Sequence, residues 1–304
     1  MHALTLLEHI NLNVPNEATA RAFYVDGLGG VVQPKSTNAR QLHVNVGCSQ
    51  FHLLLRGSVL GMEPIDHAQV WAGHIELWTS EPLERLHARL PHCSELGTDE
   101  GAVFDADAPV LRCSCPWGNR FVVRGALPSF SPAGAHPGGC GTLVAMPRLV
   151  HPLRPGAAQH LAAFWRDVLG CDAHETGGSC VVPFASGQQL VFEERDDAPP
   201  HDAYDTAPDA RAEYHLALYV PTAEAFRAAY ERAEAAGLLF ANPRFEGGPI
   251  EFASPMSWEE AERGGQFRVK ELRGAGAADA VGLVLELEVR SPTHVSCPLE
   301  RQAD

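Results

Sequence analysis

Residues 22–29 read Ala-Phe-Tyr-Val-Asp-Gly-Leu-Gly, and residues 163–170 read Ala-Phe-Trp-Arg-Asp-Val-Leu-Gly. The second stretch follows the first by 141 residues. The same spacing carries His74, in Gly-His-Ile-Glu-Leu-Trp, onto His215, in Tyr-His-Leu-Ala-Leu-Tyr. Two separate matches at one spacing indicate that the two halves of the chain are duplicates.

A shorter repeat lies within each half. Residues 9–14, His-Ile-Asn-Leu-Asn-Val, alternate polar and apolar side chains, which is typical of a strand with one buried face. A helical pattern follows over 17–24, and His74 begins a second strand-helix pattern 65 residues after His9. One such unit cannot bury its helix and sheet faces alone, so the quarters are expected to pair. Further strands are predicted at 42–46, 50–55, 120–123, 189–193, 267–272 and 283–289.

A Gly-, Pro- and Ala-rich stretch over 126–147 is the predicted linker between the halves, because this composition disfavours both helix and sheet. The sequence therefore predicts a first domain over 1–125 and a second over 148–291. Residues 292–304 form a tail of irregular composition. The stretch 251–268 has no counterpart in the first half. Its two interpretations are a lid over the cavity of the second half and a surface loop, and a loop is expected.

Composition narrows the classes of partner. The chain has 304 residues, is 45% hydrophobic and carries a formal net charge of −15, which argues against nucleic-acid binding because phosphate contacts need clustered Lys and Arg. It contains no apolar run long enough to cross a bilayer, which argues against a membrane partner. Eight cysteines without a regular framework, and a start that does not resemble a leader, predict reduced thiols and a cytoplasmic location.

Three motifs resemble the vicinal-oxygen-chelate superfamily, which contains glyoxalase I, bleomycin-resistance proteins and extradiol dioxygenases. They are the strand from His9 with the Phe23-Tyr24 helix, the strand from His74, and the turn Cys115-Pro-Trp-Gly-Asn. The resemblance spans about residues 5–290. It implies an α+β fold of four βαβββ modules, paired into two domains with curved mixed sheets. It does not fix the reaction, because one fold hosts many functions.

In the first half, the family's ligand positions carry over to His9, His52, His74 and Val122. Strand alternation turns the three imidazoles to the polar side of the sheet, so the resemblance implies a site for a divalent metal such as Zn, Fe, Co or Ni. Val122 stands where the family has a closing carboxylate, which puts glyoxalase-type proton transfer in doubt. Glu76 shares a strand face with His74 and is the candidate for proton transfer.

In the second half, His215 and Glu286 occupy matching positions, and the register of the third ligand is open. The 141-residue spacing lands on Val150, whereas His151 lies one residue further on. With a one-residue gap, His151, His215 and Glu286 form the two-His, one-carboxylate set of extradiol-type Fe²⁺ enzymes. Without it, this half has two ligands, because a one-residue slip turns a side chain to the other face.

Two classes of function follow from the resemblance. The first is a metal-dependent enzyme of the lyase, isomerase or dioxygenase type that acts on a small oxygen-bearing molecule. The alternative is a metal-free binding or resistance protein of the bleomycin-resistance type, which the missing carboxylate at Val122 favours. Both imply a small-molecule partner and are compatible with a homodimer.

Overall fold

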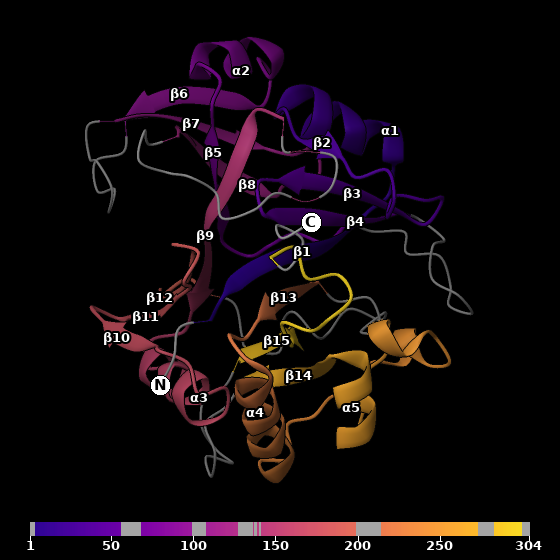
Figure 1. Cartoon of the computed structure of the whole chain (residues 1–304). Helices are drawn as coiled ribbons and strands as arrows, with labels where there is room; N and C mark the ends of the chain where they lie inside the picture. The colour runs from indigo at the N-terminus through magenta and orange to yellow at the C-terminus, as the bar shows by residue number, and fades with distance from the viewer. Residues whose placement is uncertain are drawn as a thin grey trace. The chain divides into compact units, whose positions relative to one another are not determined.

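A computed structural model describes residues 4–55, 68–98, 108–126, 136, 139, 141–198, 214–272 and 283–299. The chain separates into two compact units (Figure 1). Unit 1 comprises Met1–Ile10 and His151–Asp304, and unit 2 comprises Asn11–Val150. The division falls inside two strands, β1 (Leu6–Val14) and β9 (Leu143–Leu153), so each strand contributes to both units.

The domain boundaries expected from sequence stay predictions. Much of the predicted linker lies outside the described residues, and its last part, from Leu143, already belongs to β9. The described part of the tail contains turns and no helix or strand. It is not simply solvated, because His294 and Cys297 are buried.

Unit 2 contains two βαβββ modules. Its two strand sets have the orders β1-β4-β3-β2 and β9-β5-β8-β7-β6, with β5 parallel to β8 and antiparallel to β9. The elements of the first module after β1 are α1 (Glu17–Ala20), continued by the π-helix η1 (Arg21–Gly27), β2 (Val31–Val32), β3 (Gln41–Val46) and β4 (Ser49–Leu55). Those of the second are β5 (His74–Thr79), α2 (Leu83–Arg89), β6 (Ser94–Thr98), β7 (Pro109–Ser114) and β8 (Arg120–Gly125).

Unit 1 contains the other two modules, with strand orders β10-β11-β12-β9 and β14-β15-β13-β1. The third module continues from β9 with α3 (Ala158–Asp167), β10 (His174–Thr176), β11 (Ser179–Pro183) and β12 (Gln189–Glu194). The fourth comprises β13 (His215–Tyr219), α4 (Ala223–Ala235), η3 (Pro243–Phe245), η4 (Ile250–Phe252), α5 (Trp258–Gly264), β14 (Gln266–Leu272) and β15 (Leu283–Arg290). An isolated bridge from Leu239 to Val269 stands where the other modules have an additional strand.

The 251–268 stretch is not the loop that the sequence predicts, because it contains η4 and α5 and leads into β14. The Ser257 side chain caps α5 by accepting from the Glu260 amide, and Gly265 ends the helix with a φ of 70°. Trp258 then packs on Phe226 and Tyr230 of α4, at ring-centroid distances of 5.9 and 5.5 Å. The caps at Ser257 and Gly265 and the packing of Trp258 therefore account for the helix in this stretch.

The duplication is visible in the local structure. Gly29 and Gly170, at the 141-residue spacing, adopt φ angles of 86° and 73° at the end of the first helix of each half. Phe164 and Trp165 are fully buried at the positions that correspond to Phe23 and Tyr24. Figure 1 shows α3 beside β10 and β11, and α4 beside β14. The predicted α+β fold of duplicated modules with mixed sheets is confirmed.

One property of the helices bears on the expected partners. Among the described residues, none of them combines the length and the apolar character that a membrane span requires.

Candidate metal centre

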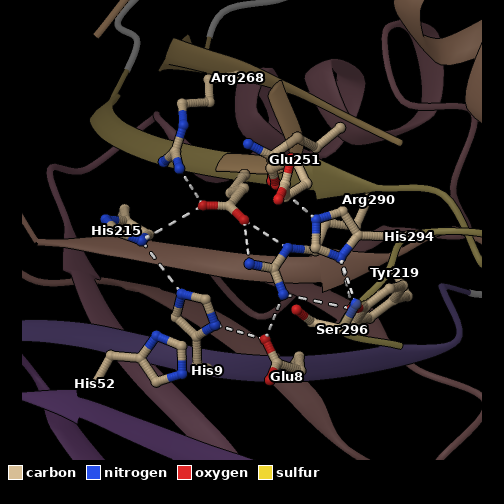
Figure 2. A network of polar contacts seen from close by, with 12 residues as sticks. Glu8, His9, His52, His215, Tyr219, Glu251, Arg268, Arg290, His294 and Ser296 are labelled. Atoms are coloured by element: carbon tan, nitrogen blue, oxygen red, sulfur yellow. Dashed lines mark hydrogen bonds and ion pairs between the residues drawn. The ribbon is translucent and has the colours of Figure 1, made fainter. Parts of the chain in front are cut away.

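Two histidines and a glutamate of unit 1 meet at the β1, β13 and β15 strands. The Nε2 atoms of His9 and His215 lie 3.2 Å apart, and His215 Nε2 lies 3.6 Å from Glu288 Oε2. All three residues are buried. Figure 2 shows the two imidazole rings facing each other across neighbouring strands. This group is one of the arrangements of metal-ligand atoms within 4.8 Å of one another among the described residues.

The parallel register of β13 and β15 explains why Glu288 belongs to this group. His215 pairs with Glu286, and Ala217 pairs with Glu288, so both carboxylates project from the strand face next to His215. In unit 2, Glu76 pairs with Val122. Because Ala217 stands at the position of Glu76 in the repeat, Glu288 is the counterpart of Val122. The resemblance had instead placed Glu286, two residues before Glu288, at the position that corresponds to Val122.

Glu8 orients the His9 ring. Its Oε2 atom lies 2.5 Å from His9 Nδ1. A carboxylate accepts hydrogen bonds, so Nδ1 carries the proton and the lone pair of neutral His9 is on Nε2, which faces His215. A carboxylate behind a histidine is the usual outer partner of a metal-bound imidazole, because it fixes the tautomer and raises the basicity of the ligand atom.

Two buried arginines balance the carboxylates. Arg268 donates to Glu286 Oε1 at 2.5 Å and also bonds Glu288 Oε2. Arg290 bonds Glu288 Oε1 and donates to Glu8 Oε2 at 2.9 Å. Each of the three carboxylates, Glu8, Glu286 and Glu288, is therefore bonded to at least one buried guanidinium group, which compensates buried negative charge.

The two arginines affect the pKa values of Glu286 and Glu288 on β15 differently. Burial would raise the pKa of Glu288, but Arg268 and Arg290, with smaller contributions from His215 and His9, hold it well below its ordinary value. Burial outweighs Arg268 at Glu286, so the pKa of Glu286 is raised, although Asn242 donates to its Oε2 at 2.8 Å. Glu288 is therefore the ionised carboxylate beside the histidines.

The end of the chain packs against the same network. Arg290 donates to the Tyr219 hydroxyl at 3.4 Å, and the His294 ring lies 3.5 Å from that hydroxyl (Figure 2). His294 also contacts the carbonyl oxygen of Glu251 at 2.9 Å and accepts from the Ser296 amide at 3.1 Å. Burial lowers the pKa of His294 to about 4. The tail therefore holds a neutral imidazole beside Arg290.

The geometry around His9 and His215 fits a divalent metal. Two ligand atoms at about 2.1 Å from one metal are separated by roughly 3.0–3.4 Å for bond angles between octahedral and tetrahedral. The 3.2 Å between the two Nε2 atoms falls in this range. Two imidazoles and a carboxylate form a donor set that binds Zn²⁺ and, with open positions, Fe²⁺.

The other ligands predicted in the first half lie in unit 2. His52 is on β4, where its ring contacts Gln50 at 2.8 Å and stacks on His43. His74 is on β5, a strand of the other set, so the sheets do not bring His52 and His74 onto neighbouring strands. Among the described residues, His74 is not part of any three-ligand group within 4.8 Å. Metal binding by His52 and His74 stays a prediction.

Glu76 is held in an ion pair. Its Oε1 atom accepts from Arg148 Nε at 2.9 Å and lies 3.4 Å from His74 Nε2. Burial would raise its pKa, but hydrogen bonds from His74 and Arg148 lower it. A carboxylate with a lowered pKa is a weak proton acceptor at neutral pH, which weighs against the proton-transfer role predicted for it.

His151 contacts neighbours other than the predicted ligands. Its Nδ1 lies 2.8 Å from the Pro152 carbonyl oxygen, and its Nε2 lies 3.4 Å from the Tyr214 hydroxyl. Burial lowers its pKa to about 4. The ligand atoms of His151, His215 and Glu286 do not form a group within 4.8 Å. In this geometry His9 and Glu288 stand beside His215 instead.

The sequence did not identify Glu8, Arg268, Arg290 or Glu288 as parts of the site. The resemblance pointed to Glu286 as the ligand, and alternation in Leu-Glu-Leu-Glu, residues 285–288, places Glu288 on the same face. Only the register with β13 shows that Glu288 is the counterpart of Val122. The pairing of His9 with His215 depends on a contact across 206 residues of sequence, which no local pattern indicates.

Comparison with known proteins agrees with this architecture. Residues 148–253 match the model of the Glyoxalase/Bleomycin resistance protein/Dioxygenase superfamily. Glyoxalase I from Zea mays is similar in structure at 10% identity and a TM-score of 0.55, over 96% of this chain and 94% of that one. A putative dioxygenase from Bacillus subtilis subsp. subtilis str. 168 is similar at 9% identity and a TM-score of 0.53, over 96% and 86%.

The cppA protein from Streptococcus pneumoniae TIGR4 shares the fold at 12% identity and a TM-score of 0.50, over 95% of this chain and 98% of that one. No curated protein matches the chain. At these identities the solved structures establish the fold, and the reaction remains a separate question. The family model therefore matches part of the second half of the chain, and the solved structures show that nearly the whole chain shares the fold of glyoxalase I.

Proposed function

We propose that the protein is a metal-dependent enzyme acting on a small molecule with adjacent oxygen atoms, and that unit 1 holds the metal through His9, His215 and Glu288. The observation that carries the proposal is the 3.2 Å approach of the two Nε2 atoms, with an ionised carboxylate at 3.6 Å. A divalent metal bound there would supply Lewis-acid stabilisation of negative charge on substrate oxygens.

The residues around the centre have distinct roles in this proposal. Glu8 keeps the His9 lone pair on Nε2. Arg268 and Arg290 keep Glu288 ionised and compensate part of the buried negative charge. Glu286 has a raised pKa and is therefore the better proton acceptor of the two candidates, Glu286 and Glu76.

Metal analysis of purified protein tests the proposal. After reconstitution with Zn²⁺, Fe²⁺, Co²⁺ or Ni²⁺ and removal of free ions, we expect about one ion per chain. His9→Ala and His215→Ala should lose it, since each removes one of three ligands. His74→Ala is the matched control and should bind like the wild type. Metal-free wild-type protein after reconstitution, or equal loss in His74→Ala, would contradict the proposal.

The two-His, one-carboxylate donor set supports a dioxygenase-type reaction within this proposal, because such sets leave positions open on Fe²⁺ for substrate and O₂. Anaerobically reconstituted Fe²⁺ protein should then consume O₂ with catechol as the probe. Turnover should fail in both His9→Ala and His215→Ala. Turnover of an aldehyde-derived substrate without O₂ consumption would favour the lyase or isomerase type instead.

One observation favours the metal-free alternative. Both carboxylate oxygens of Glu288 already bond guanidinium groups, so the cluster is largely charge-compensated by the protein itself. A metal-free binding protein would show an increased melting temperature with a small-molecule panel in the presence of a chelator, because only a ligand of the native state stabilises it. Stabilisation that disappears with the chelator would exclude this alternative.

A further inference from the structure

Two glutamates of β15 lie on the strand face next to His215 in unit 1. The parallel register pairs His215 with Glu286, whereas Glu288 stands opposite Ala217. Two residues of a strand span about 6.6 Å, so the backbone places Glu286 nearer to His215 than Glu288. The carboxylate at 3.6 Å from His215 Nε2 is nevertheless that of Glu288. Among the described residues, Glu286 belongs to no three-ligand group within 4.8 Å.

Both carboxylate oxygens of Glu286 bond nitrogen donors. Asn242 Nδ2 donates to Oε2 at 2.8 Å, and Arg268 Nη1 donates to Oε1 at 2.5 Å. A carboxylate only accepts, so the amide nitrogen is the Asn242 atom that faces it. Glu286, Asn242 and Arg268 are all buried. Donors on both oxygens fix the position of a carboxylate, because a rotation would lengthen at least one of the two bonds.

Arg268 does not by itself distinguish the two glutamates. Its guanidinium group bonds Glu286 Oε1 through Nη1 and Glu288 Oε2 through Nη2. The hydrogen bond from Asn242 to Glu286 removes this equivalence on one side. The bond from Arg290 to Glu288 Oε1 removes it on the other. The two glutamates therefore differ through Asn242 and Arg290.

The position of Asn242 is connected to the backbone of Arg268. The Phe240 amide donates to the Arg268 carbonyl oxygen at 2.9 Å. The Phe245 amide donates to the Asn242 carbonyl oxygen at 3.1 Å, which closes the turn that contains η3. The Cζ atom of Arg268 lies 4.1 Å from the centroid of the Phe245 ring. The segment 240–245 therefore holds Asn242 and Arg268 in fixed positions relative to each other.

We infer that Asn242 is a positioning residue of the metal centre, whose hydrogen bond holds Glu286 away from His215 so that Glu288 is the carboxylate ligand. The inference rests on the proposed function, because it concerns the ligand of the metal proposed there. Without the Asn242 amide, Glu286 Oε2 is a buried oxygen that has lost its donor. A cation beside His215 would then replace that donor, and Glu286 would become a ligand.

Rescue of a ligand variant tests this inference. Glu288→Gln alone should bind metal weakly. Adding Asn242→Leu, which removes the donor and nearly keeps the shape, should raise the affinity again by about tenfold or more, because Glu286 takes the place of Glu288. Adding Glu286→Gln to this double variant should abolish the gain. Competition with a chromophoric chelator measures all four affinities, including that of the wild type.

A general loss of structure in Asn242→Leu cannot produce a gain in affinity, so this readout separates positioning from a merely structural role. If Asn242→Leu prevents folding, Asn242→Ala removes the same donor without branched apolar atoms and should give the same gain. No gain in the Glu288→Gln background, or a gain that persists after Glu286→Gln, would overturn the inference.

Gln266→Met is the matched control for loss of a buried amide in unit 1. Gln266 is as buried as Asn242, but its Nε2 donates to the Ala253 carbonyl oxygen at 2.6 Å and not to a carboxylate. Gln266→Met should therefore not restore metal binding to Glu288→Gln. An equal gain in this control would show that the effect does not come from Glu286, which would also overturn the inference.

The hydrogen bond itself is measured in metal-free protein with a chelator present. Urea unfolding of the wild type, Asn242→Leu, Glu286→Met and the double variant forms a cycle, in which the double variant should lose less stability than the sum of the single losses. Additive losses would overturn the inference. A wild type that binds no ion would overturn the proposed function and the ligand selection together, whereas a wild type that binds one ion without the rescue would overturn the ligand selection alone.

Discussion

The imidazoles of His9 and His215 face each other through their Nε2 atoms at 3.2 Å, although 206 residues separate them in the chain. Each ring comes from the first strand of a module, and the two strands are neighbours in the strand order of unit 1. Two buried imidazoles at this distance either share a proton or bind a common cation. The predictions below separate these cases and test the network around them.

Glu288→Gln is expected to weaken metal binding strongly, because the substitution removes the anionic ligand and keeps the size of the side chain. Glu286→Gln should have a smaller effect, since Glu286 bonds Arg268 and Asn242 and is not in the ligand group. Competition with a chromophoric chelator measures both affinities. Equal affinities of the two variants would contradict the assignment of Glu288.

Glu8→Gln should reduce metal affinity by about 10–100-fold, the usual effect of removing an outer carboxylate from a ligating histidine. The amide of the new side chain can still accept from His9 Nδ1, but it no longer raises the basicity of Nε2. Competition with the same chromophoric chelator measures the metal affinity of this variant. Glu231→Gln, which breaks an exposed ion pair on α4, is the control and should not change the affinity.

The Arg268–Glu288 pair should show strong coupling in unfolding experiments. Arg268→Met alone leaves two glutamates buried without one guanidinium, and removal of one partner of a buried pair costs about 3–5 kcal/mol. The double variant Arg268→Met with Glu288→Gln should lose less than the sum of the two single variants. Urea unfolding of the four proteins completes the cycle. Additive losses would show that the pair is not coupled.

Stability should fall as the pH drops from about 6.5 toward 4, because His151 is neutral and buried in the native state. Its pKa is lowered from 6.5 to about 4 by burial, so the unfolded chain binds the proton first over this range. The unfolding free energy then decreases by up to about 1.4 kcal/mol per pH unit for this group. His151→Leu should flatten the dependence, measured by urea unfolding at several pH values.

The control for this pH dependence is His160→Leu, because His160 is exposed on α3. It should retain the wild-type slope. His294, whose pKa is also lowered to about 4, contributes in the same direction, so some slope should remain in His151→Leu. A slope that is unchanged in His151→Leu would contradict the buried neutral state of that ring.

The fold was largely predictable because its signals are local and repeated. Alternation at 9–14 and the matching helix ends at Gly29 and Gly170 are readable within short windows. The insertion before β14 was misjudged, since its helix is short and depends on the capping by Ser257 and the packing of Trp258. Such tertiary support is not visible in a hydrophobic pattern.

The candidate site was predictable only in part. His9 and His215 were candidates for two separate sites, and the predicted carboxylate was Glu286, whereas Glu288 emerges only from the register of two parallel strands. His74 was grouped with His9 because both begin a strand in the same half of the sequence. In the structure the neighbours of β1 are β13 and β4 and not β5, so His9 lies beside His215 of the other half, and His74 is not on a neighbouring strand.

The division of β1 has a consequence for dissection of the protein. Residues 1–10 belong to unit 1, yet the remainder of that unit starts at His151. A C-terminal fragment expressed from the Gly/Pro-rich stretch onward would include the segment that matches the family model, but it would lack Glu8 and His9. If unit 1 holds the proposed metal centre, adding a synthetic peptide that contains Glu8 and His9 to this fragment is expected to restore ion binding.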